Sequence, residues 1–361
     1  MSKTYSWVCT APGKMERQTF PIPGIGPEDL LMKIQMVTIC GSDPHYLMNR
    51  MGNTKYPQIL GHEMVGTVHA MGELAAKRYG VQKGDRITVE PYIPCGACEF
   101  CLSGHYQLCR QGTRCYGCTI SAAEPPHLWG AYGEYMYVAP GSMVHKVADG
   151  IPDEDATFSS TIGNGFRFIV NKAQLNPNDS VLIIGPGALG LCTVIAARES
   201  GVGPIIVTGV GAKDEKRLAL AEEYGADYTI RVDEEDAETC IREITGGDMV
   251  HAAIECSGAQ PSYDLAFRAM RPLATLVVVG VIGKAGVLID TDNVMRNEFQ
   301  IKGSLGQPLD VHTAMKTINK GKYRIDKMVT HKFPISKADE AIRYFMAGHP
   351  DCIRVAICGE D

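Results

Sequence analysis

The sequence predicts an α/β protein in two parts, an irregular β-rich part and a doubly wound parallel sheet. The chain has 361 residues, which is long for one hydrophobic core and favours two domains. Residues 1 to about 155 contain short apolar runs interrupted by Gly and Pro, with few helical patterns of any length. From about residue 155 onward, apolar strand segments alternate with helical segments, an alternation typical of a parallel sheet with helices on both faces.

Composition and charge restrict the classes of partner and compartment. Hydrophobic residues make up 45% and charged residues 21%, which is ordinary for a soluble globular protein. The net charge is −6 and there is no long basic run, so neither nucleic acid nor a membrane is expected as a partner. No apolar run has the length of a membrane span and the N-terminal segment lacks an apolar signal core, so we expect a cytoplasmic protein. In that reducing compartment the 13 cysteines are expected to be metal ligands and buried thiols rather than disulfides.

Three segments of the first part alternate apolar and polar residues with the period of a half-buried strand. They are residues 30–36, 64–70 and 86–90, and Gly84-Asp85 supplies a turn before the last of them. We therefore expect an irregular, barrel-like β domain.

A strand, a glycine-rich turn and a helix open the second part. The apolar run Val181–Ile184 is predicted to be a buried parallel strand, and a helix is expected from Ala188 to Ser200. Glycines between a strand and a helix let backbone N–H groups approach a pyrophosphate at the positive helix end. The motif is a weak signal alone, but in this context G-x-G-x-x-G predicts a dinucleotide site rather than a plain turn, formed by Gly185, Pro186, Gly187, Ala188, Leu189 and Gly190.

The alternation continues to about residue 302 and then loosens. Strands are expected at 205–208, 228–230, 252–256 and 275–280, and helices at 214–224, 234–244 and 262–270. A last helix at 337–346 and a last strand at 353–358 are expected to return to the first domain. The predicted plan is a β domain of residues 1–155 completed by 303–361, with a nucleotide-binding domain of residues 156–302 inserted in it.

Four cysteines lie within fifteen residues, in the spacing C-x2-C-x2-C-x7-C. Four thiolates joined by short loops can close a tetrahedron around zinc with no open coordination position, so this site would hold a loop in place and do no chemistry. Four unrelated buried thiols are a poor alternative, and an iron–sulfur cluster is a better one. The predicted structural zinc ligands are Cys95, Cys98, Cys101 and Cys109. Cys115 and Cys118 form a further C-x2-C without a second pair, and we interpret them as ordinary thiols.

A second polar group predicts a catalytic metal site. Cys40, His62 and Glu63 offer sulfur, nitrogen and oxygen, a mixed ligand set used by catalytic zinc sites that retain a water. Zinc there would lower the pKa of a bound alcohol and make hydride departure from the adjacent carbon feasible. Ser42 could then carry the alcohol proton away and His45 could pass it toward solvent.

These segments resemble the zinc-containing medium-chain alcohol dehydrogenase superfamily, and most closely its polyol branch of sorbitol- and threonine-dehydrogenase-like enzymes. The resemblance covers nearly the whole chain and rests on CGSDPHY (40–46), GHE (61–63), GDRI (84–87), the four-cysteine loop, GPGALG (185–190), IECSG (254–258) and VVVG (277–280). It implies a GroES-like irregular β-barrel catalytic domain, a Rossmann NAD(P)-binding domain, a cleft between them, and a homodimer or homotetramer. By position, Cys40, His62 and Glu63 match the polyol-type zinc set and Ser42 and His45 the proton relay. Asp43 matches a carboxylate that supports the metal site.

Two positions depart from the family pattern. The family often supplies a further Cys or Glu ligand shortly before the Rossmann domain, and alignment puts Ser160 there. A neutral hydroxyl is a poor zinc ligand, so coordination would depend on Glu63 and water. At the end of the second Rossmann strand, Gly209 replaces the acidic residue that normally binds the ribose 2′-hydroxyl of NAD. A 2′-phosphate is then not repelled, and Lys213 or Arg217 could pair with it. Asp214 lies in the same loop and the polyol branch mostly uses NAD, so the choice between NAD and NADP stays open with NAD favoured.

Several other residues have both a functional and an ordinary interpretation. In relatives, the loop of Ser257 faces the cofactor, and Asn164 falls where a residue contacts the nicotinamide. Arg354 would meet the pyrophosphate or lie on the surface. Candidates for the wall of the substrate pocket, which are as readily explained as core residues, are Tyr46, Met48, Trp129 and Tyr132.

The sequence thus predicts a zinc-dependent NAD(P) oxidoreductase with one catalytic and one structural zinc per subunit. It would interconvert a secondary alcohol, polyol or hydroxy acid with its carbonyl. Two alternatives remain open: a zinc-free reductase of the same fold, for example one acting on an activated double bond, and a binding protein that has lost catalysis.

Overall fold

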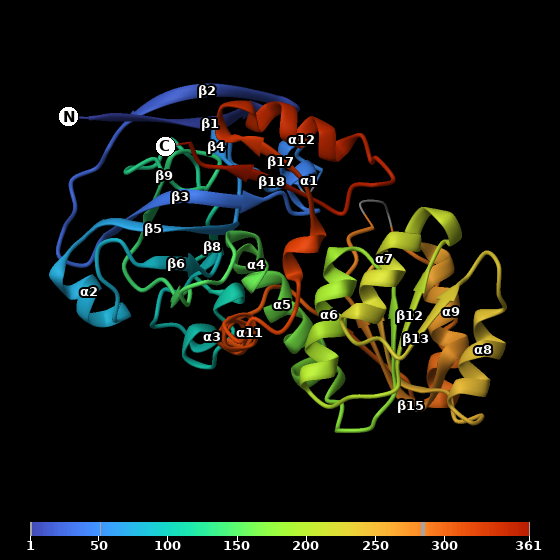
Figure 1. The fold of residues 1–361 in the computed structure, drawn as a ribbon. Helices are drawn as coiled ribbons and strands as arrows, with labels where there is room; N and C mark the ends of the chain where they lie inside the picture. The colour runs from blue at the N-terminus through green and yellow to red at the C-terminus, as the bar shows by residue number, and fades with distance from the viewer. Residues whose placement is uncertain (1, 51, 283–285, 361) are drawn as a thin grey trace. The chain divides into compact units, whose positions relative to one another are not determined.

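The chain folds as two compact units, shown in Figure 1. The computed structural model describes residues 2–50, 52–282 and 286–360. The first unit comprises Met1–Ser160 and Met315–Asp361, and the second comprises Thr161–Ala314. Helices α5 (Ser159–Phe166) and α11 (Asp310–Ile318) contain the two points at which the chain passes from one unit to the other. No helix in the described part of the chain has the length and apolar character needed to cross a lipid bilayer.

The main sheet of the first unit has seven strands. Its order is β10-β6-β5-β3-β18-β17, and β9 pairs with β3 outside this path. Neighbours are antiparallel except β17 and β18, which are parallel. The strands are β3 (Leu30–Thr38), β5 (Glu63–Met71), β6 (Arg86–Val89), β9 (Tyr135–Val138), β10 (Val144–Lys146), β17 (Val329–Pro334) and β18 (Arg354–Cys358). The predicted strands at 30–36, 64–70 and 86–90 therefore form, each with bounds shifted by one or two residues.

Shorter elements surround this sheet. Strands β1 (Lys3–Ala11), β2 (Lys14–Pro21) and β4 (Gln58–Ile59) make a three-stranded sheet, and β7 (Tyr92–Ile93) pairs with β8 (Arg114–Cys115). The α-helices are α1 (Asp43–Leu47), α2 (Glu73–Tyr79), α3 (Glu99–Leu102), α4 (Asp153–Thr157) and α12 (Ala338–Met346). The 3-10 turns are η1 (Tyr106–Leu108), η3 (Ile325–Met328) and η4 (Ile335–Lys337).

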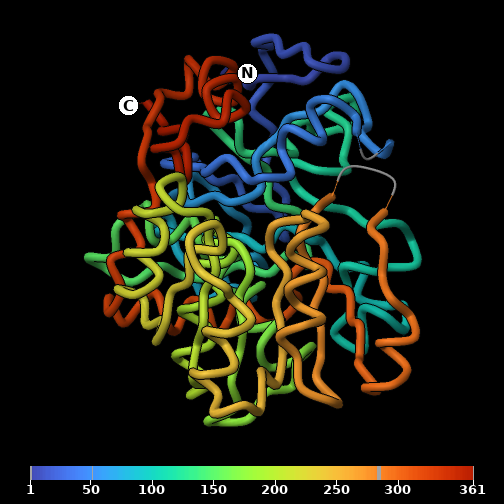
Figure 2. The backbone as a smooth tube through the Cα atoms, turned by 90° about the vertical axis from the view of Figure 1, so that its right-hand side faces the viewer, coloured from blue at the N-terminus to red at the C-terminus, as the bar shows by residue number. Residues whose placement is uncertain are grey.

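The C-terminal segment closes the first unit. Strand β18 pairs with β3, so residues near 356 lie beside residues near 37. The Tyr5 hydroxyl also donates to Glu360 at 3.2 Å. Figure 2 shows the red C-terminal segment alongside the blue N-terminal strands. Residues more than 300 positions apart thus belong to one sheet.

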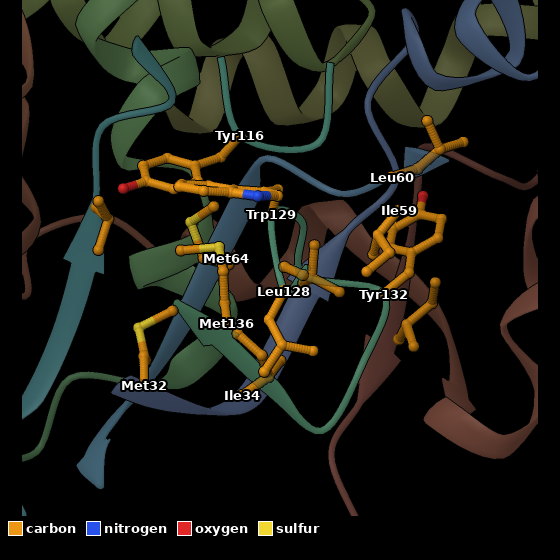
Figure 3. Close-up of a cluster of buried hydrophobic side chains, with 14 of the residues drawn as sticks. Met32, Ile34, Ile59, Leu60, Met64, Tyr116, Leu128, Trp129, Tyr132 and Met136 are labelled. Carbon is orange, nitrogen blue, oxygen red and sulfur yellow. The ribbon is translucent and has the colours of Figure 1, made fainter. Parts of the chain in front are cut away.

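An aromatic layer lies in the core of the first unit (Figure 3). The rings of Tyr116 and Trp129 stack with centroids 6.2 Å apart, and Trp129 meets Tyr137 edge-on at 5.1 Å. Trp129 is 3% exposed and its indole N–H donates to the Glu124 carbonyl. It is therefore a core residue, as the ordinary interpretation of the sequence allowed.

The second unit is a parallel sheet of six strands in the order β13-β12-β11-β14-β15-β16. Helices α6 and α7 pack on one face, and α8 and α9 on the other (Figure 1). The strands are β11 (Val181–Ile184), β12 (Ile205–Gly209), β13 (Tyr228–Arg231), β14 (Val250–Glu255), β15 (Met270–Val278) and β16 (Gln300–Gly303). The helices are α6 (Ala188–Glu199), α7 (Gly211–Glu223), α8 (Ala237–Ile244), α9 (Gln260–Ala269) and α10 (Thr291–Asn297), with a π-helical turn, η2 (Arg167–Ala173), after α5.

This architecture confirms the predicted fold class. The strand order runs outward from β11 to β13, returns, and continues from β14 to β16 on the other side, which is the doubly wound pattern. The reversal lies between β11 and β14. Edge strand β16 and helix α10 were not predicted, because their short segments carry no strong apolar period.

Candidate functional site

Cys40 lies in a tight turn between β3 and α1 that is held by Asp43. The Cys40 N–H donates to Asp43 Oδ2 at 2.9 Å, and the Asp43 N–H donates to the Cys40 carbonyl at 3.0 Å. The Ser42 hydroxyl donates to Cys40 Sγ at 3.3 Å. Asp43 is completely buried, and the Tyr132 hydroxyl donates to its Oδ2 at 3.0 Å. Tyr132 thus supports the turn from a distant part of the chain.

His62 and Glu63 reach the same place at the start of β5. His62 Nδ1 lies 3.4 Å from Asp43 Oδ1, so Asp43 contacts both the cysteine turn and the histidine ring. Gly61, with φ +92°, precedes them, and a Cβ there would lie 2.5 Å from the Tyr132 ring. The sequence needs glycine here because the strand enters the site against an aromatic side chain.

The three predicted catalytic ligands converge. Ligand atoms of Cys40, His62 and Glu63 all lie within 4.8 Å of one another, and His62 and Glu63 are buried. Burial alone lowers the pKa of His62, but Cys118, Cys40 and Asp43 together raise it well above its ordinary value. A buried imidazole beside the Cys40 sulfur and the Asp43 and Glu63 carboxylates suits a divalent cation, and this sulfur, nitrogen and oxygen donor set suits zinc.

Arg354 belongs to this centre. It is 5% exposed, donates to the Ile39 carbonyl at 2.7 Å, and places Nη2 3.4 Å from Glu63 Oε1. The other Glu63 oxygen accepts from the Thr38 hydroxyl at 2.9 Å. Arg354 is therefore a buried partner of Glu63, and the interpretation of it as a surface arginine was wrong.

Ser42 and His45 share the first turn of the α1 region. The His45 N–H donates to the Ser42 carbonyl at 3.0 Å, but among the described residues no hydrogen bond joins their side chains. Burial, and then the charge of Arg50, lowers the pKa of His45. A neutral imidazole at physiological pH can accept a proton.

Cys118 is a further residue of this centre that the sequence did not indicate. It is 3% exposed, and it stands first, ahead of Cys40 and Asp43, among the groups beside His62 that raise the pKa of that imidazole. Its turn is pressed against the histidine segment, since a Cβ on Gly117 would lie 2.2 Å from the Gly61 carbonyl oxygen. The C-x2-C spacing of Cys115 and Cys118 was visible, but only the fold reveals what lies beside it. Tyr46 is near as well, because the charge of Cys118 and then burial raise its pKa.

The four cysteines of the loop also converge. Their sulfurs lie within 4.8 Å of one another, with Cys95 and Cys101 sulfurs 3.7 Å apart and Cys98 and Cys109 sulfurs 3.9 Å apart. Four sulfurs at about 2.3 Å from one zinc are separated by about 3.8 Å. Backbone N–H groups lower the pKa of Cys98 to about 6, which favours the thiolate that a metal requires. The geometry fits a closed tetrahedral site.

The glycine-rich turn of the second unit joins β11 to α6. Gly185 has φ +101°, and its N–H donates to the Thr208 carbonyl at 3.0 Å. A Cβ on Gly190 would lie 2.1 Å from the Gly185 carbonyl oxygen, so the helix packs too closely on the turn for any side chain. Gly187 is the N-cap of α6 and is exposed. The first helical N–H groups therefore face an open turn, the arrangement that binds pyrophosphate.

No residue of β12 itself offers a carboxylate. Gly209 ends the strand, and a Cβ there would lie 3.0 Å from the Pro186 ring and 3.1 Å from Asp214 Cβ. Asp214 is 7% exposed; it accepts from the Val210 N–H at 3.0 Å and pairs with Arg217 at 2.7 Å. Lys213 is exposed. Asp214 is thus engaged within its own helix rather than presented at the strand end.

The remaining predicted residues fall in the second unit, at its boundary and, for Met48, in the first unit. Ser257 is exposed, and its Cβ lies 3.3 Å from a Cβ built on Gly185, so the two turns touch. Asn164 is half-buried in α5, and Ser160, on the same helix, is 4% exposed. Met48 is exposed and its sulfur lies near Gly13.

Comparison with known proteins agrees with this geometry. Residues 26–149 match the family model described as the alcohol dehydrogenase GroES-like domain, and residues 188–320 match that of the zinc-binding dehydrogenases. Together these matches define an oxidoreductase of the alcohol dehydrogenase family.

Individual relatives narrow the family. Sorbitol dehydrogenase of Mus musculus is 32% identical over 346 residues, covering 93% of this chain and 91% of that protein. L-Threonine 3-dehydrogenase of Pyrococcus furiosus is 34% identical over 335 residues, covering 91% and 90%. A solved structure from Sinorhizobium meliloti, described as a zinc-binding dehydrogenase bound to NADP, is 26% identical with a TM-score of 0.86, covering 99% and 100%. The chain belongs to the zinc-containing medium-chain alcohol dehydrogenase superfamily, within its polyol branch.

Proposed function

We propose that this protein is a zinc-dependent oxidoreductase that interconverts a secondary alcohol, polyol or hydroxy acid with its carbonyl, using NAD(P). The observation that carries the proposal is the convergence of Cys40, His62 and Glu63 within 4.8 Å. Zinc bound there would act as a Lewis acid toward the substrate oxygen, so that hydride can leave the adjacent carbon for the dinucleotide.

The residues around the centre have separate tasks. Ser42 takes the proton of the substrate hydroxyl, and His45, in the same turn, passes it toward solvent. Asp43 fixes the Cys40 turn and orients the His62 ring through Nδ1, leaving Nε2 for the metal. Arg354 holds Glu63 in its buried position.

We infer that three protein residues hold the catalytic metal and that Ser160 is not a fourth. A neutral hydroxyl is a weak zinc ligand, so Ser160→Ala should keep the full metal content by elemental analysis. Loss of one metal per subunit in this variant would show that the hydroxyl, or a water bound to it, belongs to the coordination sphere.

The dinucleotide is proposed to bind at the Gly185–Gly190 turn. Its adenosine ribose would lie at the end of β12, where Gly209 offers no carboxylate and Lys213 is exposed. Both NAD and NADP are therefore compatible with the strand end, and titration of the protein with each reduced form measures the preference directly.

The decisive experiment combines metal content with turnover. We expect two zinc per subunit and oxidation of at least one member of a panel of secondary alcohols, polyols and hydroxy acids with NAD or NADP. Cys40→Ala should remove one zinc and abolish turnover, whereas Cys240→Ala, on the surface helix α8, should change neither. Near-normal turnover by Cys40→Ala would refute the mechanism. One zinc per subunit in the unmodified protein would favour the zinc-free reductase.

A further inference from the structure

A buried carboxylate organises the turn after β14. Glu255, the last residue of β14, has no exposed surface. Its Oε1 accepts from the Ser257 N–H at 2.8 Å, from the Gly258 N–H at 2.8 Å and from the Ser257 hydroxyl at 2.6 Å. Three donors on one oxygen need a partner that only accepts, which a carboxylate does.

The same residue also holds the turn after β15. The Gly280 N–H donates to the Glu255 carbonyl at 2.9 Å, and a Cβ on Gly280 would lie 2.8 Å from Glu255 Oε2 and 2.4 Å from the Gly258 nitrogen. Glu255 therefore braces the ends of two neighbouring strands at once. A side chain at Gly280 would separate them.

No counter-ion is found for this carboxylate in residues 2–50, 52–282 and 286–360. Oε2 is buried and makes no well-aligned hydrogen bond there, although the Tyr263 hydroxyl approaches this carboxylate, and no Lys, Arg or His of these residues forms an ion pair with it. Burial, and then the charge of Glu255, raises the pKa of the nearby Tyr263 to about 12, so that phenol stays neutral. A buried charge without a counter-ion is costly even when it is hydrogen-bonded, and a cationic group beside it would offset that cost.

The Glu255 carboxylate lies where the order of the strands reverses, between β11 and β14. Ligands of doubly wound sheets bind outside the carboxyl ends of the strands at this point, here between β11 and β14. The Ser257 turn touches the Gly185 turn across it. The adenosine half of a dinucleotide extends toward β12, so its nicotinamide half extends toward the ends of β14 and β15.

We propose that Glu255 is a positioning residue of the dinucleotide site, and that its negative charge stabilises the bound oxidised cofactor relative to the reduced one. The carboxylate fixes the Cys256–Gly258 turn against the Gly185 turn. The oxidised nicotinamide ring carries a positive charge that the reduced ring lacks, so only the oxidised form gains from the buried charge. The inference rests on the dinucleotide binding proposed above.

Two substitutions separate charge from shape. Glu255→Gln keeps an oxygen acceptor but removes the charge, and Glu255→Asp keeps the charge but shortens the reach. Asp179→Asn is the matched control: Asp179 accepts from the Asn176 N–H at 2.7 Å at the amino end of β11, the opposite edge of the sheet. The probes are NAD and NADH, or NADP and NADPH if the unmodified protein prefers them, with Kd measured by calorimetry and nicotinamide fluorescence.

The expected pattern is specific. Glu255→Gln should weaken the oxidised cofactor about tenfold more than the reduced one. Glu255→Asp should weaken both forms equally, by about tenfold. The shorter side chain no longer holds the turn in place, whereas the negative charge remains. Asp179→Asn should bind both like the unmodified protein.

Other outcomes overturn the proposal. Equal weakening of both forms by Glu255→Gln, or no weakening, would refute the charge preference. If circular dichroism shows that the Gln variant is unfolded, unchanged affinities in Glu255→Asp would refute the positioning role. Failure of the unmodified protein to bind any of the four cofactors would instead overturn the proposed function.

Discussion

Gly117→Ala should disrupt the catalytic metal centre although Gly117 offers no ligand. Gly117 has φ +66°, and its N–H donates to the Trp129 carbonyl at 2.7 Å. A Cβ there would lie 2.2 Å from the carbonyl oxygen of Gly61, the residue before His62. Since non-bonded carbon contacts are stable near about 3.5 Å, one backbone must move by about 1 Å.

The loss of folding stability expected for Gly117→Ala has two parts. The left-handed backbone costs about 1–2 kcal/mol for a residue with a Cβ, and the overlap adds about 1–3 kcal/mol. Gly112→Ala supplies the first part alone, because Gly112 has φ +92° and a Cβ there would meet no atom within 4 Å. A 1 Å displacement of His62 would also lower turnover by about 100-fold.

Urea unfolding and zinc analysis of the two variants make the test. We expect Gly117→Ala to be less stable than Gly112→Ala by about 1–3 kcal/mol and to lose the zinc of the Cys40 centre. Equal stability and equal zinc content in the two variants would show that the turn does not support the histidine segment.

Three further predictions concern the first unit. Cys98→Ala should lose one zinc and lower Tm by roughly 5 °C or more, whereas Cys240→Ala should do neither; full heat resistance would count against a structural zinc. Burial raises the pKa of Asp155 to about 7, above its unfolded value of 3.8, so stability should fall as pH rises between these values. Asp155→Asn should therefore gain on the order of 2 kcal/mol at about pH 8 and little at about pH 4 in urea unfolding, and a gain equal at both would contradict this. Arg354→Met should cost about 3 kcal/mol by removing the buried cation that faces Glu63, against under about 1 kcal/mol for Arg78→Met at an exposed pair; similar losses would refute the buried role.

The elements that the sequence predicted well are those with local signals. The G-x-G-x-x-G turn and the four-cysteine loop are read from neighbours in the chain, and in the structure each is a compact local arrangement. The alternation of apolar strands and helices gave the doubly wound sheet for the same reason, because each βα unit carries its own period.

The contacts that the sequence missed join distant segments. Arg354 and Glu63 are 291 positions apart, and Tyr132 and Asp43 are 89 apart. Nothing in the local pattern of Arg354 distinguishes a buried partner from a surface residue, since only the pairing of β18 with β3 carries it inward. The place of Cys118 beside His62 could not be seen in the sequence for the same reason.

The late pairing of β18 sets an order of assembly during synthesis. A ribosome completes residues 161–314, with all six strands of the parallel sheet, before it makes Arg354. The inserted unit therefore has everything it needs to fold while the unit around it still lacks two sheet strands. The Arg354 guanidinium that faces Glu63 is synthesised 291 residues after Glu63 itself. The buried Arg354–Glu63 pair beside the Cys40 turn can therefore form only after every strand of the parallel sheet has been made.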